Sequence, residues 1–243
     1  MSDSDSASGL HSSLTDLAMS LMVIFILLLV HFLRAEQTRD TSESTIRDRV
    51  SELREELENI RAILDANALR GIVIKIDEND PLTLVVIVPE STEGGELFKS
   101  NSSVIQPYLQ FFLQTFAPPF LTLVAKPEWS DAIRSIIIEG HTDDAPVANE
   151  EYGNLRLSQE RSKEVLQAFL QMAKRQHVRT RDIFWSLASA SGRADKDCKV
   201  SSPPTYEERR KCRSVQFKIR MKSSMEKKFE REVTQKGLRG SSS

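Results

Sequence analysis

The longest apolar run of the chain lies near its N-terminus, in LTDLAMSLMVIFILLLVHFL, residues 14–33. Twenty helical residues extend for about 30 Å, which is the thickness of the hydrocarbon core of a bilayer. The run follows an acidic start and lacks a small-residue cleavage site, so it predicts an uncleaved transmembrane helix rather than a signal peptide. A buried core helix is the other alternative, but the charged segment that follows gives such a helix no core to join.

A second periodic stretch lies between residues 46 and 64. Its apolar positions are separated by 4, 3, 4, 3 and 4 residues, which is the a/d spacing of a coiled coil. These positions are Ile46, Val50, Leu53, Leu57, Ile60 and Leu64. We expect this helix to pair with a second copy in a parallel homodimer. Because the pattern covers fewer than three full heptads, one amphipathic helix packed on the downstream domain remains the alternative.

From about residue 70 onward, apolar runs of strand length and of helix length alternate, which predicts a mixed α/β sandwich. Strands are expected in GIVIKI, LTLVVIV, RSIIIEG, IFWSLASA and SVQFKIRM, and helices in SSVIQPYLQFFLQTFA and NLRLSQERSKEVLQAFLQMAK. The predicted organisation is a disordered start at 1–13, a transmembrane helix at 14–33, a coiled-coil or helical linker at 34–69, an α/β domain at 70–222 and a charged tail at 223–243. The final GLRGSSS is in part typical of an expression scar and is left out of the fold prediction.

Bulk composition narrows the function without defining it. The 243 residues carry a formal net charge of −2 and 40% of them are hydrophobic, which indicates neither nucleic-acid binding nor a disordered chain. Cys198 and Cys212 lack the paired spacing of a zinc site and form either a disulfide, in a domain outside the cytoplasm, or two unpaired thiols. His141 has no second ligand at metal-binding spacing, so no metal and no cofactor are expected. The sequence shows no arrangement of a nucleophile with a base, so we do not expect an enzyme.

The stretch EGHTDDAPVANEEYGNLRLSQER contains the candidate binding residues. Asp143 follows a predicted buried strand, while Asn154 and Arg161 lie seven residues apart on one face of the next helix. A carboxylate and a guanidinium that face one cleft suit a zwitterion: Asp143 holds its ammonium, and Arg161 binds its carboxylate with a bidentate fork. Asn154 supplies amide groups and caps the helix, and Leu157 packs the site. An ordinary Asp143–Arg161 salt bridge is the structural alternative.

These motifs resemble the OmpA-type peptidoglycan-binding domain, in which EGHTDD is followed by N-x-x-L-S-x-x-R at a helix start. GHTDDAPVAN before NLRLSQER, together with ELFKSNSSVIQP upstream, most closely resembles MotB-type stator B subunits. The resemblance covers roughly residues 70–222, and it implies that Asp143, Asn154 and Arg161 bind the diaminopimelate of a peptidoglycan stem peptide. The last strand departs from the family, which often has NRRVEF: in CRSVQF, Arg213 fits the first arginine and Ser214 replaces the second.

An ionisable residue, Asp16, lies inside the apolar run. A carboxylate at the bilayer centre costs about 2.5–3.5 kcal/mol on insertion scales, so such residues are functional by default, although snorkelling near a helix end relieves part of the cost. TDLAMSLMVIFILLLV resembles the span of MotB-type subunits, with Asp16 at the matching position and Thr15 in place of the usual Ala. The resemblance implies that Asp16 carries ions inside a ring of MotA-like multispan subunits. We favour protons, with sodium as the alternative if Thr15 or Ser20 coordinates a cation.

The resemblance also implies a location in the bacterial inner membrane, with a cytoplasmic N-terminus and a periplasmic domain at the cell wall. Arg34 and Arg39 follow the apolar run and no lysine or arginine precedes it, so the positive-inside rule favours the opposite orientation. We give the wall-binding motif more weight, because its ligand is absent from the cytoplasm. The short acidic N-terminus and the helical linker favour the B subunit of a Zorya anti-phage defence motor over a flagellar stator subunit. A passive tether between membrane and peptidoglycan is the third alternative.

Overall fold

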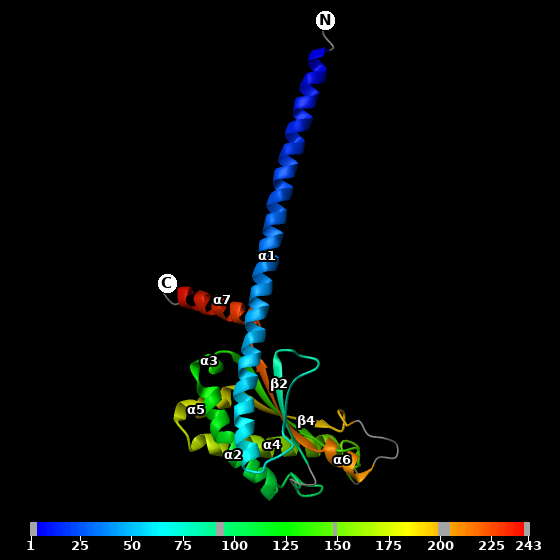
Figure 1. Cartoon of the computed structure of the whole chain (residues 1–243), viewed down its shortest axis with the longest axis vertical. Coiled ribbons are helices and arrows are strands. Elements are labelled where there is room, and N and C mark those ends of the chain that lie inside the picture. The colour runs from blue at the N-terminus through cyan, green and yellow to red at the C-terminus, as the bar shows by residue number, and fades with distance from the viewer. Residues whose placement is uncertain (1–3, 91–94, 148–149, 199–204, 241–243) are drawn as a thin grey trace. The chain divides into compact units, whose positions relative to one another are not determined.

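The computed structural model describes the backbone of residues 4–90, 95–147, 150–198 and 205–240 (Figure 1). Side chains are described for residues 17, 19–34, 44–90, 95–147, 150–198, 205–230 and 232–233. The chain separates into two compact units, Met1–Thr45 and Ile46–Ser243.

The first unit is helical. Helix α1 (Ser4–Ala66) begins before the predicted span and includes residues 4–13, for which disorder was predicted. Extending an existing helix costs little, because each added residue also adds a hydrogen bond. Searching the described residues for a helix long and apolar enough to cross a membrane finds none. The side chains of residues 14–16 and 18, Asp16 among them, lie outside the described set, so the membrane span and its carboxylate stay predictions.

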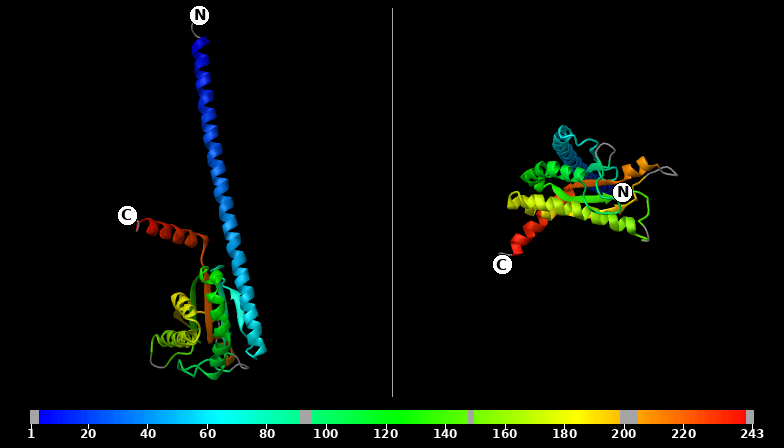
Figure 2. Two further views of the ribbon diagram at one scale, coloured as in Figure 1. Left: turned by 90° about the vertical axis from the view of Figure 1, so that its left-hand side faces the viewer. Right: turned by 90° about the horizontal axis from the view of Figure 1, so that it is seen from below.

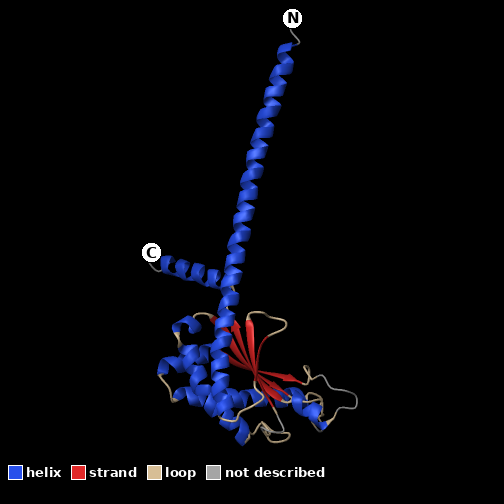
Figure 3. Cartoon of the chain, viewed as in Figure 1, coloured by secondary structure: helices blue, strands red, loops and turns tan. Residues whose placement is uncertain are grey.

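The second unit is built on one five-stranded sheet with the strand order β1-β2-β5-β3-β4 (Figure 3). The strands are β1 (Val73–Ile76), β2 (Thr83–Pro89), β3 (Ile133–His141), β4 (Ala188–Ala194) and β5 (Ser214–Met221). Only the pairing of β3 with β4 is parallel among these strands; the other neighbours are antiparallel. The last strand in sequence, β5, occupies the centre of the sheet, where Phe217 pairs with Val86 of β2 and Ile138 of β3.

Helices lie against the sheet (Figure 2), and the buried side chains of helices and sheet form one apolar core. The helices are α2 (Pro107–Ala125), α3 (Pro127–Ser130), α4 (Gly153–Lys174), α5 (Val178–Leu187), α6 (Tyr206–Cys212) and α7 (Ser224–Gly240). At the centre of the core, α2, α4, α5 and β5 contribute a cluster of buried phenyl rings: Phe112, Phe116, Phe120, Phe169, Phe184 and Phe217. Alternating apolar positions on β5 and a helical apolar face on α4 bury toward the same cluster, as the mixed α/β prediction requires.

One prediction of secondary structure needs correction. The strand predicted for IFWSLASA begins only at Ala188, because the preceding residues form α5 and bury Phe184 from a helix. His177 caps this helix by accepting a hydrogen bond from the backbone nitrogen of Arg179 at 3.2 Å. The predicted charged tail contains helix α7, which starts with a reciprocal cap between Ser223 and Glu226.

The a/d residues between 46 and 64 are buried within the chain itself. Ile46, Val50, Leu53, Leu57, Ile60 and Leu64 belong to the apolar core of the second unit, and none is more than 7% exposed. An ion pair of 2.8 Å between Glu56 and Lys126 ties the same helix to the end of α2. The predicted coiled-coil seam is therefore covered by the domain, and the alternative of one amphipathic helix packed on that domain describes it correctly. Apolar residues at this spacing can pack against a second helix or against a domain, so the sequence did not distinguish a coiled-coil dimer from one packed amphipathic helix.

We expect the Leu57→Ala substitution to lower the free energy of unfolding by about 2–5 kcal/mol, because it leaves a cavity in the core. Urea denaturation of the full chain in detergent measures this change. Glu55→Ala, at an exposed position of the same helix, is the control and is expected to change stability by less than about 0.5 kcal/mol. Efficient disulfide cross-linking of two Leu57→Cys chains in membranes would instead show that the seam faces a second copy.

Candidate functional site

The N-terminal half of α4 lies very close to β3 and β4. A Cβ atom added to Gly140 would collide with the carbonyl oxygen of Ser158, and one added to Gly192 would lie 2.6 Å from the backbone nitrogen of Gln159. The buried hydroxyl of Ser158 accepts a hydrogen bond from the backbone nitrogen of Ala194 at 3.0 Å. Glycine on the two strands and serine on the helix thus permit a contact that fixes where α4 presents its side chains.

We therefore expect Gly140→Ala to destabilise the domain by about 1–3 kcal/mol or more, because helix and strand must separate to admit the methyl group. Thermal unfolding measures the loss. Ser189→Ala, at an exposed position of β4, is the control and should change stability by less than about 0.5 kcal/mol. Glycine within a strand is otherwise unfavourable, so a stabilised Gly140→Ala variant would contradict the close contact.

Asn154 holds the loop that follows β3. Its amide nitrogen donates hydrogen bonds to the carbonyl oxygens of Asp143, at 3.2 Å, and Ala145, at 3.0 Å. The N-cap of α4 is Tyr152, which makes no side-chain cap, so the capping role predicted for Asn154 is wrong. Helix α4 starts at Gly153, and the Asn154 side chain reaches across to the loop instead. Asn154 thus positions Asp143 through the backbone.

Arg213, which directly precedes the central strand β5, binds two carboxylates at the end of the sheet's strands. Its Nε and Nη2 atoms donate to the two carboxylate oxygens of Glu90, at 3.0 and 2.7 Å, and its Nη1 atom donates to Oδ2 of Asp143. Burial alone lowers the pKa of Arg213, but its hydrogen bonds to Glu90 and Asp143 outweigh this effect and the pKa is raised. Arg213 is therefore a fixed cation, and it anchors the Asp143 carboxylate.

Arg161 is 5% exposed and lies next to this network. Its Nε atom donates to the carbonyl oxygen of Ser102 at 3.0 Å, and its guanidinium lies 4.9 Å from the centre of the Phe98 ring. Burial lowers the pKa of Arg161 to about 10, and repulsion from Arg213 adds to this effect, while Glu90 and Asp143 oppose it. At this pKa the side chain is still a cation at neutral pH.

The structure separates the two residues of the predicted pair. Across the side chains described, no carboxylate lies within 4.0 Å of the Arg161 guanidinium, whereas the Asp143 carboxylate is bound by Arg213. The alternative of a simple Asp143–Arg161 salt bridge is therefore wrong. The Asp143 carboxylate nevertheless acts on Arg161 through its charge, because it raises the pKa of Arg161 against the larger lowering by burial. The site is a buried guanidinium with no carboxylate partner, beside a carboxylate fixed by a second guanidinium.

The remaining predicted residues support this arrangement. Leu157 is buried on α4, between the positions of Asn154 and Arg161. Cys198 and Cys212 form a disulfide, with their Cα atoms 5.0 Å apart, which selects the first of the two alternatives. Because Cys212 ends α6, this bond secures the backbone directly before Arg213.

Sequence reasoning gave no role to Glu90, Phe98 or Ser102, and it left the role of Arg213 open. Glu90 directly follows the strand LTLVVIVP, and Arg213 directly precedes SVQFKIRM. Because β2 and β5 are antiparallel neighbours, the two residues lie side by side at the same end of these strands. The position of Arg213 in the CRSVQF motif was the available signal. Phe98 and Ser102 reach Arg161 from the loop within ELFKSNSSVIQP, a stretch that carried the resemblance but gave no indication of this contact.

His141 is the last residue of β3, and its side chain contacts residues outside the site. Its ring nitrogens are 3.6 Å from Glu139 and 3.5 Å from Asp197, and the side chain is buried. The residues that the structure describes contain no group of three or more side chains arranged to hold a metal ion.

Comparisons with known proteins agree with this geometry at the level of fold. A putative MotB-like protein from Desulfovibrio vulgaris superimposes with a TM-score of 0.54 at 23% identity, over 73% of this chain and 99% of that one. The chain has the fold of a MotB-like protein. The chain also matches two other structures with lower scores. The periplasmic domain of Helicobacter pylori MotB matches with a TM-score of 0.48 at 15% identity, over 70% of this chain and 92% of that one. The cell wall anchor of the T6SS from Pseudomonas aeruginosa matches with a TM-score of 0.46 at 21% identity, over 67% of this chain and 96% of that one. No protein-family model matches the sequence, and no curated protein matches it.

Proposed function

We propose that the MotB-like domain binds the stem peptide of peptidoglycan and thereby anchors the chain to the cell wall. The observation that carries this proposal is the buried Arg161 guanidinium, which has a carbonyl oxygen and an aromatic ring as its described partners but no carboxylate. A buried cation without a counter-charge is costly, so the site favours a ligand that supplies an anion. The role is one of binding, without catalysis and without a cofactor.

The site also provides for the positive end of a zwitterion. Arg213 engages Oδ2 of Asp143, and among the described residues Oδ1 accepts one hydrogen bond, of 3.3 Å, from the backbone nitrogen of Ala145. That oxygen is suited to an ammonium group of diaminopimelate, while Arg161 binds the neighbouring carboxylate. Asn154 holds the loop that presents Asp143. Binding of the ligand carboxylate to Arg161 requires the segment from Phe98 to Ser102, which now contacts the guanidinium, to move aside.

We further propose that residues 14–33 cross the inner membrane, with the N-terminus in the cytoplasm and the domain in the periplasm. The described large apolar side chains between residues 17 and 33 are all exposed, by 42 to 67%, and such a surface needs an apolar environment. A span with Asp16 inside it suits an ion-driven motor of the MotA/MotB type, powered by the proton motive force, with a ring of MotA-like subunits as partner. Because residues 46–64 are covered by the domain, a second copy would pair through the span.

The Zorya anti-phage defence motor is our preferred assignment within this class. It rests on the acidic residues Asp3 and Asp5 before the span and on the helical segment between span and domain. A flagellar stator subunit would share the wall site and Asp16, whereas a passive tether would need only the wall site. Infection and motility assays of a strain that lacks the chain distinguish the first two, and the Asp16 carboxylate distinguishes both motors from the tether.

Purified sacculi test the wall-binding proposal. The detergent-solubilised full chain is expected to co-sediment with sacculi, and a free stem peptide that contains diaminopimelate should compete for binding. The matched competitor has lysine at the same position, which keeps the ammonium group and lacks the carboxylate that Arg161 would bind. Equal competition by the two peptides would exclude the assigned role of Arg161, and failure to sediment would exclude wall binding.

A further inference from the structure

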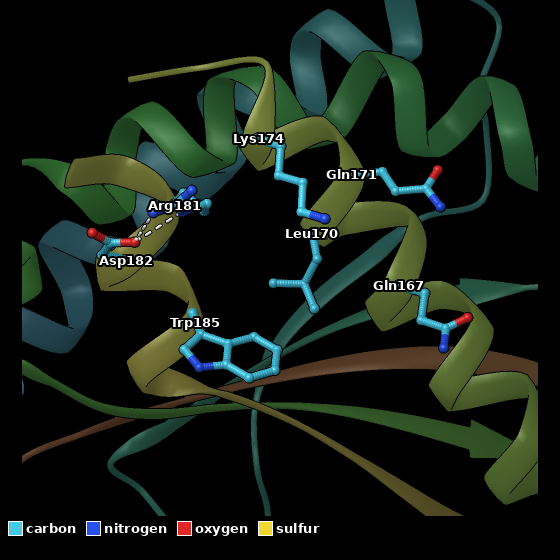
Figure 4. Close-up of a pocket in the computed structure, with 7 residues that line it drawn as sticks. All are labelled: Gln167, Leu170, Gln171, Lys174, Arg181, Asp182 and Trp185. Atoms are coloured by element: carbon cyan, nitrogen blue, oxygen red, sulfur yellow. Dashed lines mark hydrogen bonds and ion pairs between the residues drawn. The ribbon is translucent and has the colours of Figure 1, made fainter. Parts of the chain in front are cut away.

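We propose that the pocket between α4 and α5 binds the glycan strand of peptidoglycan, as a second subsite distinct from the one formed by Asp143 and Arg161. This inference rests on the proposed function and names a further part of the same polymer. The pocket encloses about 670 Å³ and is lined from α4 by Gln167, Leu170, Gln171 and Lys174, and from α5 by Arg181, Asp182 and Trp185 (Figure 4). A volume of this size accommodates a small ligand or part of a chain.

The α4 wall presents its polar groups in a row. Gln167, Gln171 and Lys174 follow one another at helical spacings of four and three residues, so they lie on the same side of α4. The row is about 10 Å long, because each helical residue rises by about 1.5 Å. Each glutamine amide offers donors and an acceptor, as needed for hydroxyl and acetamido groups. The arrangement therefore suits an extended ligand that repeats polar groups along its length.

The α5 wall presents an aromatic face. Trp185 is 67% exposed, although its neighbour Phe184 is fully buried in the core and Trp129, the other tryptophan of the chain, is 3% exposed. Figure 4 shows the Trp185 indole and the Leu170 side chain pointing into the same hollow. A pyranose ring has an apolar face of C–H groups that stacks on an indole and a rim of polar groups that reaches beyond it. The methyl group of an acetamido substituent would fit against Leu170.

The charge of the lining favours a sugar polymer over other ligands. Arg181 is paired with Asp182 at 2.8 Å, which leaves Lys174 as the one cation of the lining without a described partner. A nucleic acid would call for several unpaired cations along the site. A protein partner would call for a larger apolar centre than Leu170 and Trp185 provide. Amides, an aromatic face and one ammonium group match a strand of N-acetylated amino sugars.

The two subsites lie on the same helix. Arg161 and Gln167 are six residues apart on α4, which corresponds to about 9 Å along its axis. Six residues also turn the helix by roughly 240°, so the two subsites face different sides of α4. One polymer segment occupies both when its glycan strand lies along α5 and an attached stem peptide extends around α4 to Arg161. Occupation of one subsite then raises the effective concentration of the polymer at the other.

Tryptophan fluorescence tests the pocket directly. In the full-length Trp129→Phe variant in detergent, Trp185 is the remaining tryptophan, so its emission reports on the pocket. Titration with a linear tetramer of N-acetylglucosamine is expected to shift this emission saturably and to protect it from iodide quenching. A glucose tetramer without acetamido groups is the control ligand and should bind at least about 5-fold more weakly, which is the worth of one lost hydrogen bond. Gln171→Ala should weaken the acetylated tetramer by a similar factor.

Sacculus binding provides an independent measurement. Trp185→Ala is expected to reduce co-sedimentation while leaving competition by the stem peptide unchanged, and Val178→Ala, at an exposed position of the same helix, should change neither. Arg161→Ala should leave the fluorescence response to the acetylated tetramer intact. If the folded Trp129→Phe protein gives no saturable response, the glycan assignment is wrong, even if Trp185→Ala impairs sacculus binding. If the response is present and Arg161→Ala has no effect on sacculi, the stem-peptide proposal fails and the glycan subsite stands.

Discussion

The Arg161→Ala variant is expected to bind the stem peptide about 30- to 5,000-fold more weakly than the wild-type chain while its domain remains folded. The range corresponds to about 2–5 kcal/mol, which is typical when one partner of a buried, charge-assisted contact is removed. The fold should persist, because the described polar contact of Arg161 is one hydrogen bond, to Ser102. Burial has already lowered the pKa of Arg161 to about 10, so removing this desolvated cation also removes a cost.

Calorimetric titration with the diaminopimelate peptide measures this effect, and circular dichroism verifies the fold. Arg156→Ala is the matched control, because Arg156 lies on the same helix, is half exposed and pairs with Glu150 and Glu160 away from the site. Arg161→Lys should recover part of the affinity, since lysine keeps the charge and loses the planar fork. A folded Arg161→Ala protein that binds the peptide as tightly as wild type would remove Arg161 from the site.

The Asp16→Asn variant is expected to lose all motor activity while it still inserts, assembles and binds sacculi. Asparagine keeps the size and the hydrogen-bonding capacity of aspartate but has no carboxyl proton to gain or lose. A neutral amide costs no more to place in the membrane than the ionised carboxylate, so insertion and assembly should be preserved. No other acidic residue and no lysine or arginine lies between residues 14 and 33, and His31 is fifteen residues away along the helix, too far to neutralise Asp16 as a structural pair.

Phage protection, or motility in a flagellated host, measures activity, and co-purification with the multispan partner verifies assembly. Asp16→Glu keeps a titratable carboxyl group and should retain part of the activity. Asp5→Asn changes an acidic residue before the span and is expected to have no effect on activity. Normal activity in an assembled Asp16→Asn complex would leave only the passive tether among the functions considered.

The amino-acid pattern alone was sufficient for the elements whose signal is local. The alternation in SVQFKIRM predicted β5, and the apolar face of NLRLSQERSKEVLQAFLQMAK predicted α4 with few errors at its ends. The spacing of Asp143 and Arg161 around a strand end and a helix face indicated that the two residues lie near one another. In the structure the charge of Asp143 raises the pKa of Arg161. Such local signals depend on the spacing of residues along one element, so they survive without knowledge of the partners.

Only the tertiary structure decided which groups meet. Arg213 lies 70 residues from Asp143, and it reaches that carboxylate because β5 inserts between β2 and β3 in the sheet. The seam at residues 46–64 has the same spacing whether its partner is a second helix or this domain, and only the packed core shows that it is the domain. Within IFWSLASA, strand propensity yields to the burial of Phe184 from α5. In each case the outcome depends on a surface contributed by residues far away in sequence, and a periodic pattern carries no information about that surface.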